Sequence, residues 1–186
     1  MKLGKKGIRA LGIAESFIKK GDKSILAGIV MRGDMHIDGV AIAKISVGGM
    51  DATDGIIEIF RSLSREDIHV ILLGGCVISW FNIVDVERVC EETRAPVVCV
   101  TYDESEGLEK YIREYFADDC EDRIKLYKKL GARERIKLNT GYEVLVRFIG
   151  MTKSEARILL NRFTTHGKIP EPIRVARLTA RAVLKA

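Results

Sequence analysis

Two short apolar segments, "IHVILL" at 68–73 and "PVVCVTYD" at 96–103, constrain the fold more than any other feature of the chain. Strands that are apolar along nearly their whole length are buried on both faces, as parallel strands between helices are. Amphipathic helical patterns follow these segments at 84–95 and 107–116. The alternation predicts a βαβα unit and therefore an α/β fold.

Three further strands are expected before this unit, and a Gly-Asp turn separates the last two as in an antiparallel hairpin. A helix is expected over 51–63, because apolar residues recur there at helical spacing after an aspartate. Three antiparallel strands, a helix and a βαβα unit follow the order of a ribonuclease H-like domain with a mixed sheet, in which strand 1 is central and the fourth strand lies beside it. The expected leading strands are 8–16, 24–33 and 35–49.

The rest of the chain continues the α/β pattern with a charged helix, a pair of strands and two closing helices. Thr152 stands at capping-box spacing from Glu155, and two prolines introduce the last helix. The expected elements are a helix at 121–130, strands at 134–140 and 142–150, and helices at 152–167 and 173–186.

Composition limits the class of protein. A chain of 186 residues is long enough for one domain, which we expect to span 1–186. It has no apolar run near the ~18 residues of a membrane span and a poor match to a signal peptide, so a cytoplasmic location is expected. The four cysteines lack C-x-x-C spacing, which favours reduced thiols over zinc or disulfides. The formal net charge of +5 permits a polyanionic partner such as nucleic acid.

Several stretches in combination resemble the archaeal endonuclease dU family, which is itself similar to endonuclease V in the ribonuclease H-like superfamily. The resemblance covers nearly the whole chain. It implies a nuclease of DNA repair: a magnesium-dependent hydrolase that cuts DNA beside deaminated bases, with deoxyuridine suggested by the family name. The stretches are "GIAES" at 12–16, "ISVGGMDATDGI" at 45–56, "ILLGGCVISWFNIVD" at 71–85, "TRAPVVCV" at 93–100 and "GKIPEPIRVARLTARAV" at 167–183.

The chain departs from the family pattern at two positions that matter for catalysis. By resemblance, an aspartate is expected directly after Gly-Ile in the first strand and another before the second glycine after the fourth strand. This chain has Ala14 and Gly74 there. Phosphodiester hydrolysis of this kind needs carboxylates that converge on magnesium, and neither residue supplies one. The cofactor is therefore either Mg²⁺, as the resemblance implies, or none.

Three other acids are candidates for catalysis. Glu15 can replace a carboxylate at position 14 only if the backbone turns there, because successive strand side chains point to opposite faces. Asp51 and Asp54 begin the expected helix and can place a carboxylate near the site, although capping of that helix accounts for both without metal. Glu15 and Asp51 are thus candidate metal ligands, and all three are candidate catalytic residues.

The histidines suggest a second type of site, but a structural role accounts for each of them. Asp34, His36 and Asp38 alternate as metal ligands on one strand face would, but a solvated face beside a turn gives the same pattern. His69 lies in an apolar strand and His166 near a helix end, and neither has a visible nucleophile partner. We therefore expect His36 to lie on a solvated face and His69 and His166 to be structural.

Substrate contacts are expected at the diglycine and its aromatic neighbours. Gly74 and Gly75 permit close backbone approach, and Trp80, Phe81 and Asn82 can stack on and hydrogen-bond a flipped base. The alternative is that the two rings cover the core while Asp85 caps the next helix.

The last helix carries a basic stripe at spacings of three or four residues, formed by Arg174, Arg177, Arg181 and Lys185. Such a stripe can bind phosphates, unless acids such as Glu171 neutralise it.

The sequence therefore predicts a ribonuclease H-like protein that resembles endonuclease dU and whose metal site is eroded. Its alternative function is a non-catalytic module that binds nucleic acid or protein. Both rest on one spatial prediction, that Ala14 and the diglycine at Gly74 are neighbours.

Overall fold

A computed structural model describes residues 7–104 and 107–186. One seven-stranded sheet runs through them in the order β3-β2-β1-β4-β7-β9-β8, and a two-stranded hairpin, β5-β6, stands apart. The strands are β1 (Arg9–Phe17), β2 (Lys23–Arg32), β3 (Ile37–Ser46), β4 (Val70–Leu73), β5 (Val77–Ile78), β6 (Asn82–Ile83), β7 (Val97–Thr101), β8 (Glu134–Lys137) and β9 (Glu143–Ile149).

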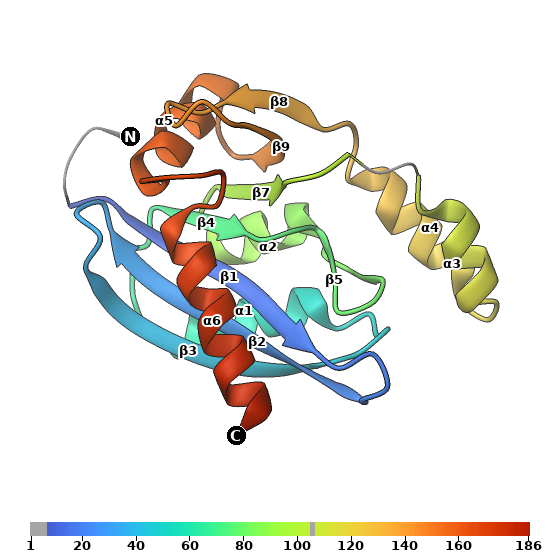
Figure 1. Ribbon diagram of the computed structural model, residues 1–186. Helices are drawn as coiled ribbons and strands as arrows, with labels where there is room; N and C mark the ends of the chain where they lie inside the picture. The colour runs from blue at the N-terminus through green and yellow to red at the C-terminus, as the bar shows by residue number, and fades with distance from the viewer. Residues whose placement is uncertain (1–6, 105–106) are drawn as a thin grey trace.

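Helices cover both faces of this sheet (Figure 1). α6 crosses in front of β1 and β2, whereas α1 and α2 lie behind, and α3 and α4 project beyond the strand ends. None of the helices in the described ranges is long and apolar enough to cross a membrane. The helices are α1 (Ala52–Ser62), α2 (Val86–Thr93), α3 (Glu109–Tyr115), α4 (Cys120–Lys129), α5 (Lys153–Phe163) and α6 (Glu171–Lys185).

The expected order of elements is confirmed. β1, β2 and β3 form the antiparallel meander, and β4 pairs parallel to β1 with Ile13 opposite Leu73. β7 continues the parallel part beside β4, and β9 and β8 extend the sheet antiparallel to it. The capping box of Thr152 and Glu155 is present, and the carboxylate of Asp85 accepts a hydrogen bond from the backbone of Arg88.

The β5-β6 hairpin was not expected from the sequence, which lacks the glycine-rich turn that usually marks a two-stranded ribbon. Its tip instead places Ser79, Trp80 and Phe81 at positive φ angles of 44°, 59° and 64°. Side chains other than glycine rarely adopt this backbone conformation, so pattern reasoning does not find such a turn.

Two hydrophobic cores lie on opposite faces of the sheet. Behind it, β1 residues Leu11 and Ile13 pack with the buried side of α1 and α2. In front, α5 and α6 cover Ala10 and Ala14, and Phe163 of α5 is fully buried there. Odd-numbered and even-numbered residues of β1 thus face different cores, as the alternation of a doubly buried strand requires.

The front core depends on a close approach between α6 and β1. A Cβ atom at Gly12 would lie 2.3 Å from the carbonyl carbon of Pro172 and 2.5 Å from its Cβ. These distances are too short for any side chain, and the obstacle is helix backbone, which cannot move aside alone. Gly12 is therefore required for α6 to lie directly on the central strand.

Gly12→Ala should destabilise the protein by about 2 kcal/mol or more, because overpacking forces the backbone of α6 away from β1. Urea unfolding followed by circular dichroism measures the change. Gly7→Ala is the matched control, since a Cβ at Gly7 meets nothing within 4 Å. Equal stability of the two variants would contradict the role given to Gly12.

Candidate nucleic-acid site at the strand ends

The carboxyl ends of β1, β4 and β7 meet at one edge of the sheet, here called the carboxyl edge. The backbone N–H of Gly74 donates a 2.9 Å hydrogen bond to the carbonyl of Ile13. A Cβ added at Gly74 would lie 3.7 Å from the Cβ of Ala14. The predicted neighbourhood of residues 14 and 74 is therefore confirmed, and two aspartates at these positions would converge.

The space between these two positions is closed and apolar. Ala14 is only 6% exposed, and the Cγ2 atom of Ile173 lies 3.1 Å from the place of a Cβ on Gly74. The small cavity beside them holds about 10 Å³ and is lined by aliphatic side chains and the diglycine. That volume is at the limit for a single water, which needs roughly 10–15 Å³. Magnesium with several ligands does not fit these residues.

Glu15 faces away from Ala14, as strand alternation predicts. Its half-buried carboxylate accepts a hydrogen bond from the backbone of Ser79. Burial raises the pKa of Glu15, and the Ser79 bond and the positive charge of Arg177 only partly offset this. A carboxyl group that holds its proton more tightly than usual is a poor ligand for magnesium, so the local environment does not favour Glu15 as a replacement ligand.

Glu15→Gln should stabilise the protein near pH 7 by about 1 kcal/mol, the scale of ordinary single substitutions. The folded-state pKa of Glu15 lies above the ordinary value of 4.5. The contribution of Glu15 to the free energy of unfolding is therefore fully present below pH 4.5 and is lost as pH rises through the folded-state pKa. The gain from Gln should therefore vanish near pH 4. Thermal unfolding between pH 4 and 8 tests this, with the exposed Glu58→Gln as control. A gain that is the same at every pH would contradict the prediction.

Asp51 occupies the cap position of α1, but its carboxylate does not bond the helix. It accepts bonds of 3.0 and 3.1 Å from the backbone of Ser46 and one of 2.7 Å from Nδ2 of Asn82. Partial burial opposes the charge, but these bonds outweigh it and lower the pKa of Asp51. The cap is supplied instead by Oδ1 of Asn82, which accepts the N–H of Ala52 at 2.9 Å.

Asn82 is thus a structural link. Its side-chain amide joins the end of β3, the start of α1 and the base of the hairpin, and the residue is fully buried. This burial leaves its side chain out of reach of a base. Asp54 lies elsewhere, exposed on α1 and 2.7 Å from Arg88 of α2. The structure therefore does not bring Glu15, Asp51 and Asp54 together as one site.

The acids and histidines of the β2-β3 turn pair locally instead of forming a metal site. Asp34 contacts Arg32 and His36, and Asp38 forms an ion pair with Arg9. The pairing of β2 with β3 also contains a register shift at Val30 and Met31. Elsewhere, Nδ1 of His69 accepts the N–H of Arg9. Within 7–104 and 107–186, no three His, Cys, Asp or Glu side chains are grouped so that they could hold a metal ion.

An aromatic cluster covers the hairpin tip. Trp80 and Phe81 pack against Tyr115 and Phe116 of the α3 region, with ring centroids 5.3 to 6.0 Å apart. This packing matches the core-covering role that the sequence left open, although both hairpin rings stay partly exposed. Backbone held in the left-handed region by non-glycine residues is strained, and such strain gathers at functional sites.

Arg123 holds this cluster in place, and pattern reasoning missed it because "EDRIKLYKKL" looks like a solvated helix. The residue is 4% exposed, and its guanidinium stacks 3.9 Å from the ring centroid of Phe116. It donates to the carbonyls of Gly48, Gly49 and Phe81 and to the carboxylate of Asp119.

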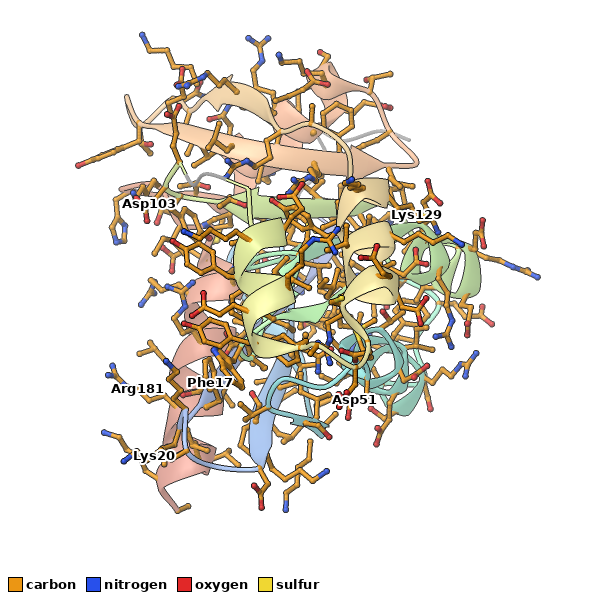
Figure 2. All side chains as sticks on the ribbon, turned by 90° about the vertical axis from the view of Figure 1, so that its right-hand side faces the viewer. Phe17, Lys20, Asp51, Asp103, Lys129 and Arg181 are labelled. Carbon is orange, nitrogen blue, oxygen red and sulfur yellow. The ribbon has the colours of Figure 1, made fainter. Side chains whose placement is uncertain are left out.

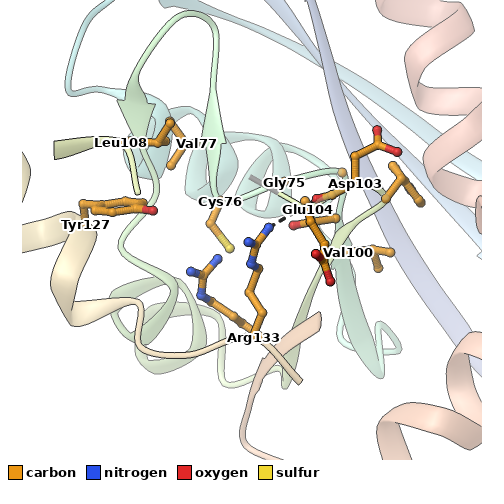
Figure 3. A pocket seen from close by; sticks show the side chains of 13 residues that line it. Gly75, Cys76, Val77, Val100, Asp103, Glu104, Leu108, Tyr127 and Arg133 are labelled. Atoms are coloured by element: carbon orange, nitrogen blue, oxygen red, sulfur yellow. Dashed lines mark hydrogen bonds between the residues drawn. The ribbon is translucent and has the colours of Figure 1, made fainter. Parts of the chain in front are cut away.

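A pocket of about 330 Å³ opens at the carboxyl edge directly beside the diglycine (Figure 3). Tyr127 and Leu108 stand on one side of it, and Asp103 and Glu104 on the other. Arg133, Arg147 and Cys76 also line it. No motif marks the pocket in the sequence, because its walls come from four separate segments. The thiols of Cys76 and Cys99 are hydrogen-bonded to each other. The four cysteines all lie in the described part of the chain, where they are free thiols and form no disulfide.

The basic stripe of α6 is only partly neutralised. Glu171 accepts a 2.8 Å hydrogen bond from Nε of Arg174 within the helix. Arg177 and Arg181 are exposed and make no ion pair with another described residue. In Figure 2, Arg181 lies toward the same side as Lys20 of the β1-β2 turn, while Asp51 lies away from them. Two cations of the stripe, Arg177 and Arg181, therefore remain without an ion pair in the described part of the chain.

Comparison with known proteins identifies relatives along the whole chain. A family model described as endonuclease dU matches residues 6–184. A UPF0215 protein of Pyrobaculum calidifontis is 36% identical over 174 residues, which is 93% of this chain and 95% of the relative. A protein of unknown function from Archaeoglobus fulgidus superposes with a TM-score of 0.83 at 32% identity, covering 96% of this chain and 99% of that one.

More distant structures establish the fold class. Endonuclease V of Streptomyces avermitilis has a TM-score of 0.69 at 16% identity, with 97% of this chain and 82% of that one covered. Endonuclease V of Ciona intestinalis, solved with a DNA that contains inosine, has a TM-score of 0.63 at 15% identity, covering 97% and 87%. The fold is therefore the ribonuclease H-like fold of endonuclease V, as the element order predicted.

Proposed function

Since this chain belongs to the endonuclease dU family, we propose that it binds DNA at deaminated bases such as deoxyuridine and that its phosphodiester hydrolysis is weak or lost. The observation that carries the proposal is the pair Ala14 and Gly74, adjacent at the carboxyl edge and closed off by Ile173. Family members are expected to hold magnesium there, and these residues offer it no oxygen ligand.

Metal-dependent hydrolysis needs carboxylates that hold the ion, and a bound ion would lower the pKa of water and stabilise the leaving oxygen. The nearest acid, Glu15, lies on the other side of β1 and bonds Ser79. Asp51 is held by Ser46 and Asn82. A catalytic centre built from these two would require the local structure to break first, so residual cleavage should be slow.

Binding has separate support from charge and shape. The exposed cations Arg177 and Arg181 of α6 lie beside an edge that also carries a 330 Å³ pocket. Phosphate contacts supply most of the affinity of proteins for DNA, and a pocket beside them suits an extruded base. The partly exposed rings of Trp80 and Phe81 border this region and can stack on a base. Gly74 and Gly75 form one wall of the pocket and allow close approach.

The proposal is tested with a labelled oligonucleotide duplex that contains one deoxyuridine, beside the same duplex with thymidine. We expect binding that weakens steeply with salt, and with Mg²⁺ little or no nicking over hours. Rapid magnesium-dependent cleavage at the deoxyuridine would refute the loss of catalysis. Absence of binding even at low salt would overturn the proposed function and favour a protein-interaction module of the same fold.

If residual cleavage is measured, substitutions show which carboxylate takes part in it. Glu15→Gln should abolish it if Glu15 takes part in catalysis, and should leave it unchanged if Glu15 only stabilises the hairpin through Ser79. Asp54→Asn is the matched control, because Asp54 lies on the surface of α1 beside Arg88. Equal loss of cleavage in both variants would contradict a specific role for either acid.

A further inference from the structure

Arg177 occupies a special position among the cations of α6. It follows Ile173, whose side chain closes the space at Gly74, by one helical turn. Its guanidinium carbon lies 5.9 Å from the ring centroid of Tyr102, which directly follows β7. A cation at this distance is attracted to the face of the ring.

The same guanidinium also acts on the end of β1. Burial raises the pKa of Glu15, and the charge of Arg177 lowers it. Burial likewise raises the pKa of Tyr102, again opposed by Arg177. Because α6 packs on β1 and also contacts β4, and the guanidinium lies beside Tyr102 at the end of β7, Arg177 stands at the carboxyl edge.

Arg177 is moreover available to a ligand. It is exposed, and no acid in the described part of the chain forms an ion pair with it, in contrast to the bond between Arg174 and Glu171. Close by, the hydroxyl of Tyr102 is buried and has no hydrogen-bond partner among the described residues. Buried polar groups without a partner are rare in proteins, and a ligand oxygen or a water commonly supplies one.

We propose that Arg177 takes the place of the divalent metal ion at the carboxyl edge and binds a phosphate group of the nucleic acid without metal. The inference rests on the proposed function and specifies how the eroded site still holds its ligand. A guanidinium presents donors in a planar fork that matches two phosphate oxygens. It cannot coordinate or activate water, so the phosphate is bound and not hydrolysed.

The residues at the three positions form a consistent set. Aspartates at positions 14 and 74 would place negative charge on the side of the sheet that α6 covers, and the charge of Arg177 would in turn disfavour a divalent ion bound there. With alanine and glycine there, the positive charge stays free for an anion. A Cβ on Gly74 would lie 3.7 Å from the Cβ of Ala14, and Ile173 of α6, one turn before Arg177, closes the space beside them.

The first test measures oligonucleotide affinity by fluorescence anisotropy in EDTA, where no metal can contribute. Arg177→Gln should weaken binding about tenfold or more, as the loss of a charged hydrogen bond does. Arg181→Gln, on the same stripe and equally unpaired, is the matched control and should weaken it about twofold or less, as expected of an exposed charge. Arg177→Lys should recover part of the lost affinity, because lysine keeps the positive charge but lacks the planar set of donors that binds two phosphate oxygens.

These measurements distinguish failure of the role given to Arg177 from failure of the proposed DNA binding. Equal effects of Arg177→Gln and Arg181→Gln would overturn the special role of Arg177 while DNA binding itself stands. Wild-type protein that binds only when Mg²⁺ is added would also overturn the inference. Failure to bind under any condition would overturn both proposals.

The second test reinstates the carboxylates and reads out Mg²⁺ binding by calorimetry, without any DNA. Ala14→Asp with Gly74→Asp should bind Mg²⁺ more tightly than wild type, and adding Arg177→Gln should increase the affinity about tenfold further. Circular dichroism checks that each variant is folded, since an aspartate at 74 must displace Ile173 by a few tenths of an ångström. Identical Mg²⁺ affinity with and without Arg177 would place its charge elsewhere and overturn the inference.

Discussion

The contact of α6 with the central strand determines the arrangement of everything at the carboxyl edge. Gly12 allows the backbone of Pro172 to lie against β1 at a distance that no side chain would permit. From this contact the helix extends across the front of the sheet, and the positions of Ile173 and Arg177 follow from helical geometry. A helix held farther from the sheet would leave the space at Gly74 open and carry its guanidinium away from Tyr102.

The carboxyl edge has a closed apolar part at Ala14 and Gly74, and an open, charged surface around it. Ala14, Gly74 and Ile173 fill the place where a metal centre is expected in this family, and Ala14 and Ile173 belong to the front core. Around them lie a pocket and unpaired cations. Alanine and glycine avoid the mutual repulsion and the cost of burial that two carboxylates would bring, so the loss of hydrolysis proposed above would also stabilise the fold.

Most of the fold is readable from the sequence because its signals are local and strong. The apolar runs that become β4 and β7 are buried on both faces, and the periodicity of the helices gives the order of elements. Strand alternation also places Glu15 and Ala14 on opposite faces. The adjacency of Ala14 and Gly74 then follows from topology, since neighbouring parallel strands end at the same edge.

Contacts between segments that share no pattern could not be predicted from the sequence. The exchange of roles between Asp51 and Asn82 is one case, because an aspartate before a helix is the usual cap and an asparagine 31 residues later carries no such signal. The hairpin at Ser79 to Phe81 is another, since its backbone conformation is uncommon for those residues. The pocket is a third, because its walls come from distant parts of the chain.

Arg123 has a consequence for which parts of the chain can change. Three of its partners are backbone carbonyls, at Gly48, Gly49 and Phe81, and any amino acid supplies such an oxygen. The side chains at those three positions are therefore not constrained by this bonding, whereas position 123 itself is, because a lysine has neither the reach in several directions nor the flat surface that stacks on Phe116. Gly48 and Gly49 are restricted for a different reason, because a Cβ there would lie 3.1 Å from Trp80 and 2.7 Å from the Cβ of Ser46. Side-chain identity thus matters at position 123 for bonding and at the two glycines for space.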